Sequence, residues 1–339
     1  MNSKTISKSK IPLFSAKSKS SVSINPSPFR VLLQKEISDQ VRSWRFIILI
    51  SLVILTSLGS LYASLGSFAK SVEPTNAEGV FFFLRLFTLS SGKLPSYVIF
   101  ISFLSPLLGI GLGFDSINSE FNRGTLSRLL SQPIHRDNIL NAKFLAPLIV
   151  ISVMFFSLGF LVMGSGLIAL GIPPTAEEFI RIILFIFISI VYVAFWLNLS
   201  IFLSVKFRQP ATAVLMGIAI WLLFTVFYPM IINLVTQLFE PSRYASIHNV
   251  FVFQKIKFLL MQLMPGQLFS EATTTLLMPS VRSLGPMTVW QLQGAIPSPL
   301  PLGQSILLVW PQLTGLIAVT IVCFVLSYVS FMRREVRSR

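Results

Sequence analysis

Side chains that could perform chemistry are few in this chain of 339 residues, and they lie far apart in the sequence. There are two histidines, His135 and His248, and one cysteine, Cys323, which has no second cysteine to pair with. A histidine-activated nucleophile or a metal held by paired histidines needs more such groups. Asp115 and Glu120 are the one modest candidate pair of carboxylates for acid–base chemistry. We therefore expect no catalytic residue, no metal site and no cofactor in this chain.

A nucleotide-binding motif is missing as well. The phosphate-binding loop of many ATPases requires a glycine five residues before a Gly-Lys pair that is followed by Ser or Thr. Gly92 and Lys93 adjoin, but the earlier glycine is absent. Hydrolysis of ATP by this chain itself is therefore not expected.

The elements that must position any site are membrane helices. Hydrophobic residues make up 53% of the chain and charged residues only 12%, which is too apolar for an ordinary soluble domain. A helix needs about 20 apolar residues to span the bilayer core. Six runs meet this requirement, and they cover residues 46–66, 97–114, 146–171, 181–205, 211–237 and 304–332. The predicted fold is an all-α polytopic membrane protein with six transmembrane helices.

The interiors of these six runs hold no Asp, Glu, Lys or Arg; Asp115 and Arg181 stand at span ends. Transporters driven by protons or ions usually place ionisable groups inside the membrane. We therefore expect the energy for any transport to come from another subunit.

The basic residues indicate an orientation. Nine Lys or Arg precede the first run, four lie in 115–145, two follow the fourth run and four follow Met332, whereas the short connections on the other side hold four. Short cytoplasmic loops carry an excess of Lys and Arg. We therefore predict that both termini are cytoplasmic, in a multi-pass protein of the plasma (inner) membrane.

The chain before the first run divides into two parts. Residues 1–26 are rich in Ser and Lys and read as a disordered basic tail near anionic headgroups, although an organellar transit peptide shares this composition. From Ser27 to Arg45, apolar and basic side chains fall on opposite helical faces, with Pro28 suited to the first helical position. We predict an amphipathic interfacial helix over 27–45, which packs under the bundle or grips a partner.

Two connections on the outer side contain apolar stretches. The stretch around Arg85 is too short for a span, and it predicts a partly embedded helix or an extension of the second span. The connection 238–303 is long, with an apolar helical pattern broken at Pro265 and Gly266 and again at Pro279. Such segments form amphipathic or re-entrant helices that close a pathway or cap the bundle.

The segment 115–145, between the second and third runs, is the charged exception. Its pattern predicts two short helices broken at Pro133, the first from Glu120 to Ser131. On that helix Leu126, Leu129 and Leu130 share one face, and Glu120, Gly124, Ser127 and Ser131 share the opposite one. We expect the leucines to pack against the membrane helices, and Asp137 to cap the helix that leads into the third span.

This segment resembles the signature of ABC type 2 permeases, the membrane subunits of a class of ABC transporters. The matching residues are Glu120, Gly124, Thr125, Leu126, Leu130, Ser131, Pro133, Arg136 and Lys143. Weaker matches in the same order are QKEISDQVRSWRFIIL before the first run, LSVKFRQPATAVLMGIAIWLL across the fourth and fifth runs, and LMPGQLFSEATTTLLMP in the outer connection. The resemblance covers nearly the whole chain.

The resemblance implies a permease subunit of an ATP-driven exporter, paired with a second permease subunit in a homodimer or heterodimer. Segment 115–145 would be the cytoplasmic coupling helix that docks into a separate ATPase subunit. The docking residues implied are Glu120, Arg123, Gly124, Thr125, Ser127, Arg128, Ser131, Pro133 and Arg136. Alternatives are an integral membrane enzyme acting on lipids through Asp115 and Glu120, and a non-catalytic anchoring subunit. Nucleic acid is not an expected partner, because the positive charge follows the membrane topology.

Overall fold

We describe the protein from a computed structural model. The described residues are 28–70, 81–90, 94–126, 131, 135–171, 173–239, 241, 246–281 and 299–333. The tail 1–26 lies outside them. Within these ranges all regular structure is helical, and six helices are long and apolar enough to cross a membrane. The prediction of an all-α protein with six spans is confirmed.

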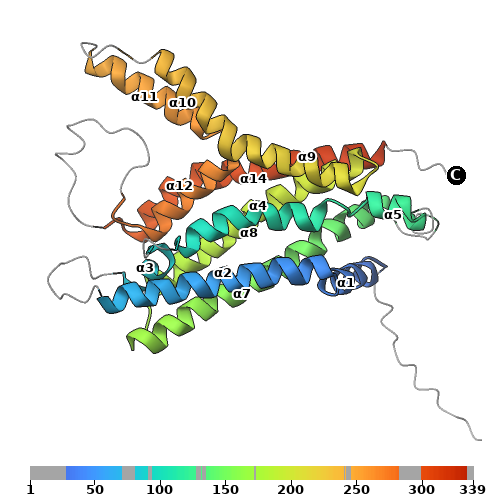
Figure 1. The fold of residues 1–339 in the computed structure, drawn as a ribbon, viewed down its shortest axis with the longest axis horizontal. Helices are drawn as coiled ribbons and strands as arrows, with labels where there is room; N and C mark the ends of the chain where they lie inside the picture. The colour runs from blue at the N-terminus through green and yellow to red at the C-terminus, as the bar shows by residue number, and fades with distance from the viewer. Residues whose placement is uncertain are drawn as a thin grey trace, which may run out of the picture.

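The spans run roughly side by side along the long axis of the molecule, except that the second part of the fifth span slants away from the others (Figure 1). They are α2 (Trp44–Lys70), α4 (Tyr97–Gly113), α7 (Arg136–Leu170), α8 (Ala176–Lys206), the consecutive helices α9 (Pro210–Leu222), η1 (Leu223–Phe227) and α10 (Tyr228–Leu238), and α14 (Leu302–Met332). Each begins or ends within a few residues of the predicted run, except that α7 starts earlier and includes Lys143.

Helix α8 is the central helix of the bundle. In its most apolar 18-residue stretch 67% of the residues are buried, compared with 6% in the fifth span. Thr175 starts it with a capping box: its side chain accepts a hydrogen bond from Glu178 N–H, while the Glu178 carboxylate accepts one from Thr175 N–H. The helix therefore begins five residues before the predicted apolar run 181–205, with Glu177 and Glu178 in its first turn.

Helices α4 and α8 approach closely at two glycines. A Cβ atom on Gly109 would lie 2.6 Å from Trp196 Cβ and 2.7 Å from Leu197 N, and one on Gly113 would lie 2.8 Å from Ser200 Cβ. Ser200 Oγ donates a hydrogen bond to the Ile110 carbonyl across the same contact, at 3.0 Å. Small residues let two membrane helices pack this closely because they remove the side-chain barrier between backbones.

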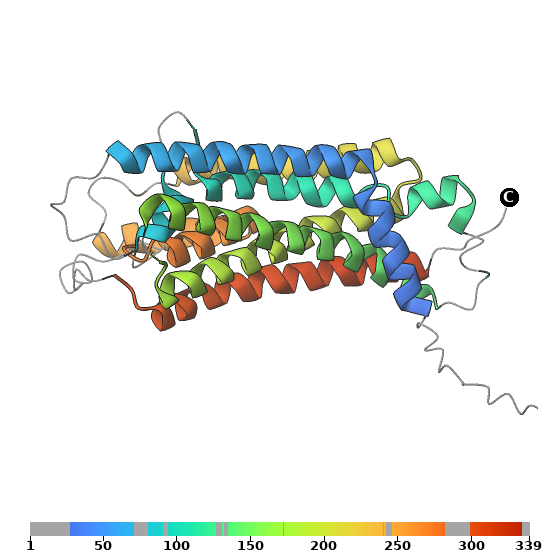
Figure 2. The same cartoon turned by 90° about the horizontal axis from the view of Figure 1, so that it is seen from below.

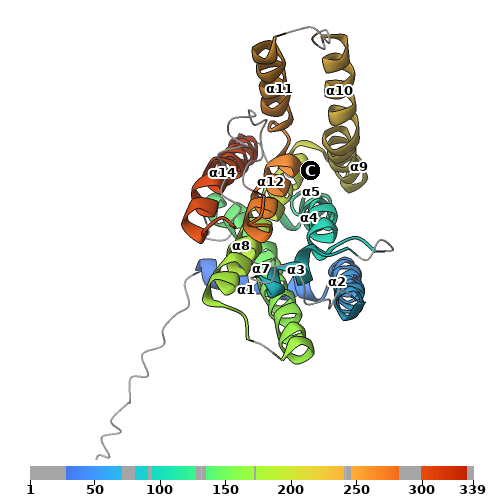
Figure 3. The ribbon, with the colours of Figure 1, turned by 90° about the vertical axis from the view of Figure 1, so that its left-hand side faces the viewer.

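The fifth span contains a π-helical turn, η1, because Pro229 follows it. Proline has no N–H to donate and its ring clashes with the carbonyl one turn earlier, so the helix widens there. Beyond this turn, α10 pairs with α11 (Ile247–Met261), and Tyr228 Oη donates a hydrogen bond to the Leu260 carbonyl at 2.8 Å. In Figure 3 the two helices stand side by side away from the other spans.

Two short helices fill the end of the bundle opposite α5. Helix α3 (Phe82–Thr88) buries Phe83, Leu84, Leu86 and Phe87, and its first turn is fixed by Phe83 N–H, which donates to Glu178 Oε1 at 2.9 Å. The stretch forms a separate helix, so the alternative of a longer second span is wrong, and the partial embedding of α3 in the membrane stays a prediction. Helix α12 (Pro265–Leu277) starts and stops at the predicted prolines and packs against α8 and α14.

Arg181 holds this end together from a fully buried position on α8. Its guanidinium group pairs with Glu177 and donates to the Leu276 carbonyl at the end of α12. It also donates to Ser305 Oγ and to the Leu300 carbonyl at the start of α14. The guanidinium group has five N–H donors in a rigid planar arrangement, so one side chain can donate hydrogen bonds to three chain segments at once.

At the other end, α1 (Pro28–Val41) crosses beneath the spans, at a steep angle to α2 (Figure 2). It begins at Pro28, as predicted, and packs mainly against α7. A break at Arg42 and Ser43 separates it from α2, where Ser43 Oγ accepts a hydrogen bond from Phe46 N–H. The position of α1 at a membrane interface stays a prediction.

Candidate functional site

Three elements meet at a buried lysine at the α1 end of the bundle. Lys143, on α7, has 5% of its side chain exposed, and its Nζ lies 2.7 Å from Oε1 of Glu120 on α5 (Asn118–Asn122). The same Nζ lies 3.3 Å from both carboxylate oxygens of Glu36 on α1. We call Glu36, Glu120 and Lys143 the Lys143 junction. It ties α1, α5 and α7 together through one charge.

The junction carries two carboxylates for one ammonium group, and Lys35 is a second cation beside it. Lys35 lies 3.5 Å from Glu36 and from Asp39. Burial lowers the pKa of Lys35, but the carboxylates of Glu36, Glu120 and Asp39 outweigh that effect and raise it above 10.5. A hollow of about 390 Å³ opens beside the junction, between α1, α4, α5 and α7.

The base of α5 is fixed to α8 as well. Ser204 Oγ accepts hydrogen bonds from the N–H groups of Ile117 and Asn118, at 3.0 and 3.2 Å. Asn122 Nδ2 donates to the Arg208 carbonyl in the turn between the fourth and fifth spans. Asn118 and Ile117 are fully buried. Helix α5 is therefore a firmly held extension of the second span, bonded directly to α7 and α8 and linked to α1 through Lys143.

The predicted helix from Glu120 to Ser131 is wrong in one respect, because it breaks at Gly124. Helix α5 ends at Asn122, and Gly124 has φ +68°, a left-handed conformation that glycine adopts without steric cost. A Cβ atom there would meet nothing within 4 Å, so the glycine is required by backbone conformation. Helical structure resumes at Thr125 and Leu126, and Leu126 is buried, as predicted.

The predicted cap of the third span is also wrong. Helix α7 begins at Arg136 after His135, and no side chain makes a capping hydrogen bond there. Asp137 lies in the first turn and accepts a hydrogen bond from Tyr328 Oη of α14, at 3.1 Å. Its carboxylate links the third and sixth spans.

The predicted docking residues are distributed unevenly between the interior and the surface. Glu120 points inward to Lys143, whereas Arg123, Thr125 and Arg136 are exposed. Arg123 and Arg136 form no ion pair with any other residue in the described ranges. Ser131 is exposed, and Ser127, Arg128 and Pro133 lie outside the described residues, as do Leu129 and Leu130.

Residues 30–336 match the family described as "ABC-2 family transporter protein". The chain belongs to this family. The match covers almost the whole chain, so this ABC-2 permease is the membrane subunit of an ABC transporter. Members of the family associate with an ATP-binding subunit. None of the curated proteins compared with the permease matches it.

The carboxylates that a lipid-acting enzyme would need are already engaged in the permease. Asp115 forms an ion pair with Arg45, which also lies over the Phe114 ring, 5.2 Å from its centroid. Glu120 is occupied by Lys143. In the part of the chain that the structure describes, no group of three or more His, Cys, Asp or Glu could hold a metal ion. The carboxylates of Asp115 and Glu120 therefore form ion pairs that hold helices together.

Glu36 and Ser204 were missed by the sequence reasoning. Ser204 sits in an apolar run that gives no sign of its partner, because the two N–H groups it binds belong to the backbone of another span. Glu36 follows Lys35 on a helix with many charges, and nothing local distinguishes it. The available signals were in the family resemblance, which includes Lys143 in its signature and Glu36 in the weaker match before the first run, since a buried lysine requires carboxylate partners.

Proposed function

We propose that this permease is the transmembrane subunit of an ATP-driven exporter, and that α5 with the turn after it docks into a separate ATPase subunit. The observation that carries the proposal is the Lys143 junction. A displacement of α5 by a docked ATPase subunit would be transmitted to α7 through Lys143, to α1 through Glu36 and to α8 through Ser204.

The exposed groups around α5 supply a surface for such a partner. Arg123 and Arg136 are cations that can pair with carboxylates of an ATPase subunit. Gly124 turns the chain so that Thr125 follows at the surface and Leu126 returns to the interior. The remaining surface residues of the proposal are Ser127, Arg128, Ser131 and Pro133, and Glu120 contributes from the inside, through its ion pair with Lys143.

The mechanism is a rigid-body transmission. ATP binding would draw two ATPase subunits together, and each would push its α5 segment. Because α5 is linked to α1, α7 and α8, the push would move these helices as one body. That movement would change the opening between two permease subunits. The chain would perform no covalent step.

Pairing with a second permease subunit, identical or related, is supported by the fifth span. Most of its residues are exposed in the single chain, among them Leu215, Val226, Met230 and Leu234. A span with so little intramolecular contact can pack against lipid or against a second subunit. We assign α9 and α10 to the dimer contact, and the α5 end with both termini to the cytoplasm of a plasma (inner) membrane, in line with the excess of Lys and Arg there.

Copurification tests the proposal. The full chain, tagged and extracted in mild detergent, should bring down a protein that binds ATP, and the complex should hydrolyse ATP. An active, stable preparation with no ATP-binding protein would contradict the proposal and would favour an anchoring or enzymatic role.

A further inference from the structure

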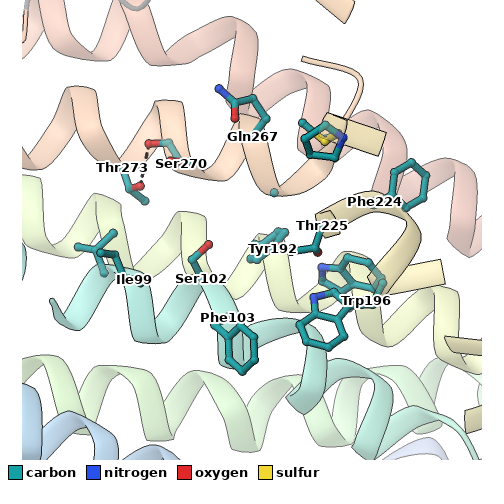
Figure 4. A pocket seen from close by; sticks show the side chains of 15 residues that line it. Ile99, Ser102, Phe103, Tyr192, Trp196, Phe224, Thr225, Gln267, Ser270 and Thr273 are labelled. Carbon is teal, nitrogen blue, oxygen red and sulfur yellow. Dashed lines mark hydrogen bonds between the residues drawn. The ribbon is translucent and has the colours of Figure 1, made fainter. Parts of the chain in front are cut away.

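A cavity of about 330 Å³ lies between α4, α8, η1 and α12. This volume falls within the range of small-molecule sites. Figure 4 shows Gln267, Ser270 and Thr273 of α12 on one side of it, and Ser102 and Tyr192 of α4 and α8 on the other. The π-helical turn contributes Phe224 and Thr225.

Aromatic rings form one wall of the cavity. They are Phe103, Tyr192, Trp196, Trp221 and Phe224. Phe103 and Trp221 pack edge to face with centroids 5.2 Å apart, and Tyr192 and Trp196 do so at 6.4 Å. No Asp, Glu, Lys or Arg is among the lining residues. Aromatic faces attract cations, and most strongly where water is scarce.

A carboxylate stands directly behind the polar wall. Glu271 has 4% of its surface exposed and accepts hydrogen bonds from the amide groups of Gln267, Gln262 and Gln312, at 3.0, 2.9 and 3.3 Å. Both of its oxygens accept a hydrogen bond from a glutamine amide. Among the described residues no Lys, Arg or His pairs with it.

We propose that this cavity binds an organic cation with an apolar body. The rings would contact the body and the charged centre, and the field of Glu271 would reach the ligand through Gln267, whose side chain both lines the cavity and donates to the carboxylate. An anion of the same size would meet this negative field without any compensating cation. The ligand class deepens the proposed function, since such a cation would be the cargo of the permease.

Binding can be measured without ATP, so this inference and the proposed function can fail separately. The full chain is placed in nanodiscs of phosphatidylcholine, a zwitterionic lipid, and radiolabelled tetraphenylphosphonium and tetraphenylborate are compared. The two ions have the same shape and opposite charge. Empty nanodiscs give the partition into lipid, which is subtracted.

Tetraphenylphosphonium should bind saturably above the empty discs, and tetraphenylborate should not. Glu271→Gln keeps the hydrogen-bonding shape but removes the charge, and it should weaken binding of the cation about tenfold. Asp39→Asn removes an exposed charge at the α1 end of the bundle, away from the cavity, and should leave binding within twofold, which corresponds to about 0.4 kcal/mol. Equal binding of both ions, or full affinity in Glu271→Gln, would overturn the inference.

A second pair of variants tests the location. Ser270 lines the cavity, so Ser270→Trp should fill it and abolish saturable binding of tetraphenylphosphonium. Ser157→Trp places the same side chain on the exposed face of α7 and should bind like the wild type. Unchanged binding in Ser270→Trp would place the cation elsewhere and overturn the inference. A chain that binds the cation but never associates with an ATPase would contradict the proposed function alone.

Discussion

Lys143 Nζ lies 2.7 Å from Glu120 Oε1, and this ion pair joins the start of the third span to the helix that follows the second. Both residues belong to the charged segment between two apolar spans. Their pairing makes the segment a part of the bundle itself, and Glu36 extends the connection to α1. A movement imposed on α5 must therefore displace α7 and α1.

Removing the shared cation should destabilise the permease. Lys143→Met leaves Glu36 and Glu120 facing each other, mostly buried, with the half-exposed Lys35 beside Glu36 as the remaining cation, and breaking a buried pair in this way costs about 3 to 5 kcal/mol. The free energy of unfolding, measured by denaturant titration in micelles, should fall by that order. Lys35→Met is the matched control, because Lys35 is half exposed and its pairing contributes less than about 1 kcal/mol. Equal losses in the two variants would contradict the account.

Gly124 should tolerate asparagine but not valine. The left-handed conformation at φ +68° costs most L-residues about 1 to 2 kcal/mol, and asparagine adopts it more readily than a β-branched residue. Gly124→Val should insert normally and lose ATP-coupled transport, whereas Gly124→Asn should keep it. The measurement is transport by vesicles containing the complex, with membrane insertion checked by immunoblot. Full transport by Gly124→Val would show that the turn has no part in coupling.

The contact between α4 and α8 should not accommodate a larger side chain. In Gly109→Val the new Cβ would meet Trp196 Cβ at 2.6 Å and the Leu197 backbone at 2.7 Å, so the helices must separate. We expect a loss of at least about 1 to 3 kcal/mol in unfolding free energy. Gly59→Val is the control, because a Cβ at Gly59 meets nothing within 4 Å. Wild-type stability in Gly109→Val would contradict the packing described.

Arg181 should resist replacement even by lysine. A lysine keeps the charge but cannot reach Glu177, the Leu276 carbonyl and the Leu300 carbonyl together, so buried acceptors lose their donors. Arg181→Lys should lower the thermal unfolding midpoint, followed by tryptophan fluorescence, by several degrees or more. Arg333→Lys, at an exposed position, should unfold like the wild type. An unchanged unfolding midpoint would mean that the hydrogen bonds of the Arg181 guanidinium group do not stabilise the α12 end of the bundle.

The spans could be predicted from the sequence because a membrane helix is encoded locally, in a continuous apolar run. The breaks around α12 followed from prolines for the same reason, whereas the polar first turn of α8 after Thr175 lies before its apolar run. The Lys143 junction could not, since Glu36 and Lys143 are 107 positions apart and neither position is unusual in its own helix. The break at Gly124 was missed because a glycine inside a helical pattern reads equally well as a small surface residue.

The cavity was out of reach for a different reason. Its rings come from four helices, and an aromatic residue in an apolar run gives no sign of whether it faces lipid, core or a hollow. Glu271 was visible as a charge in the outer connection, but its three glutamine partners come from α11, α12 and α14.

Crosslinking from α5 is the most direct test of docking by this segment. A photoreactive amino acid placed at Arg123 in the tagged chain should capture an ATP-binding protein on illumination, because Arg123 is exposed beside the turn at Gly124. The same amino acid at Ile168, an exposed position toward the opposite end of α7, should not capture it. Capture from Ile168 and not from Arg123, or an ATP-binding protein that crosslinks to neither while copurifying, would contradict the assignment of α5 as the docking element.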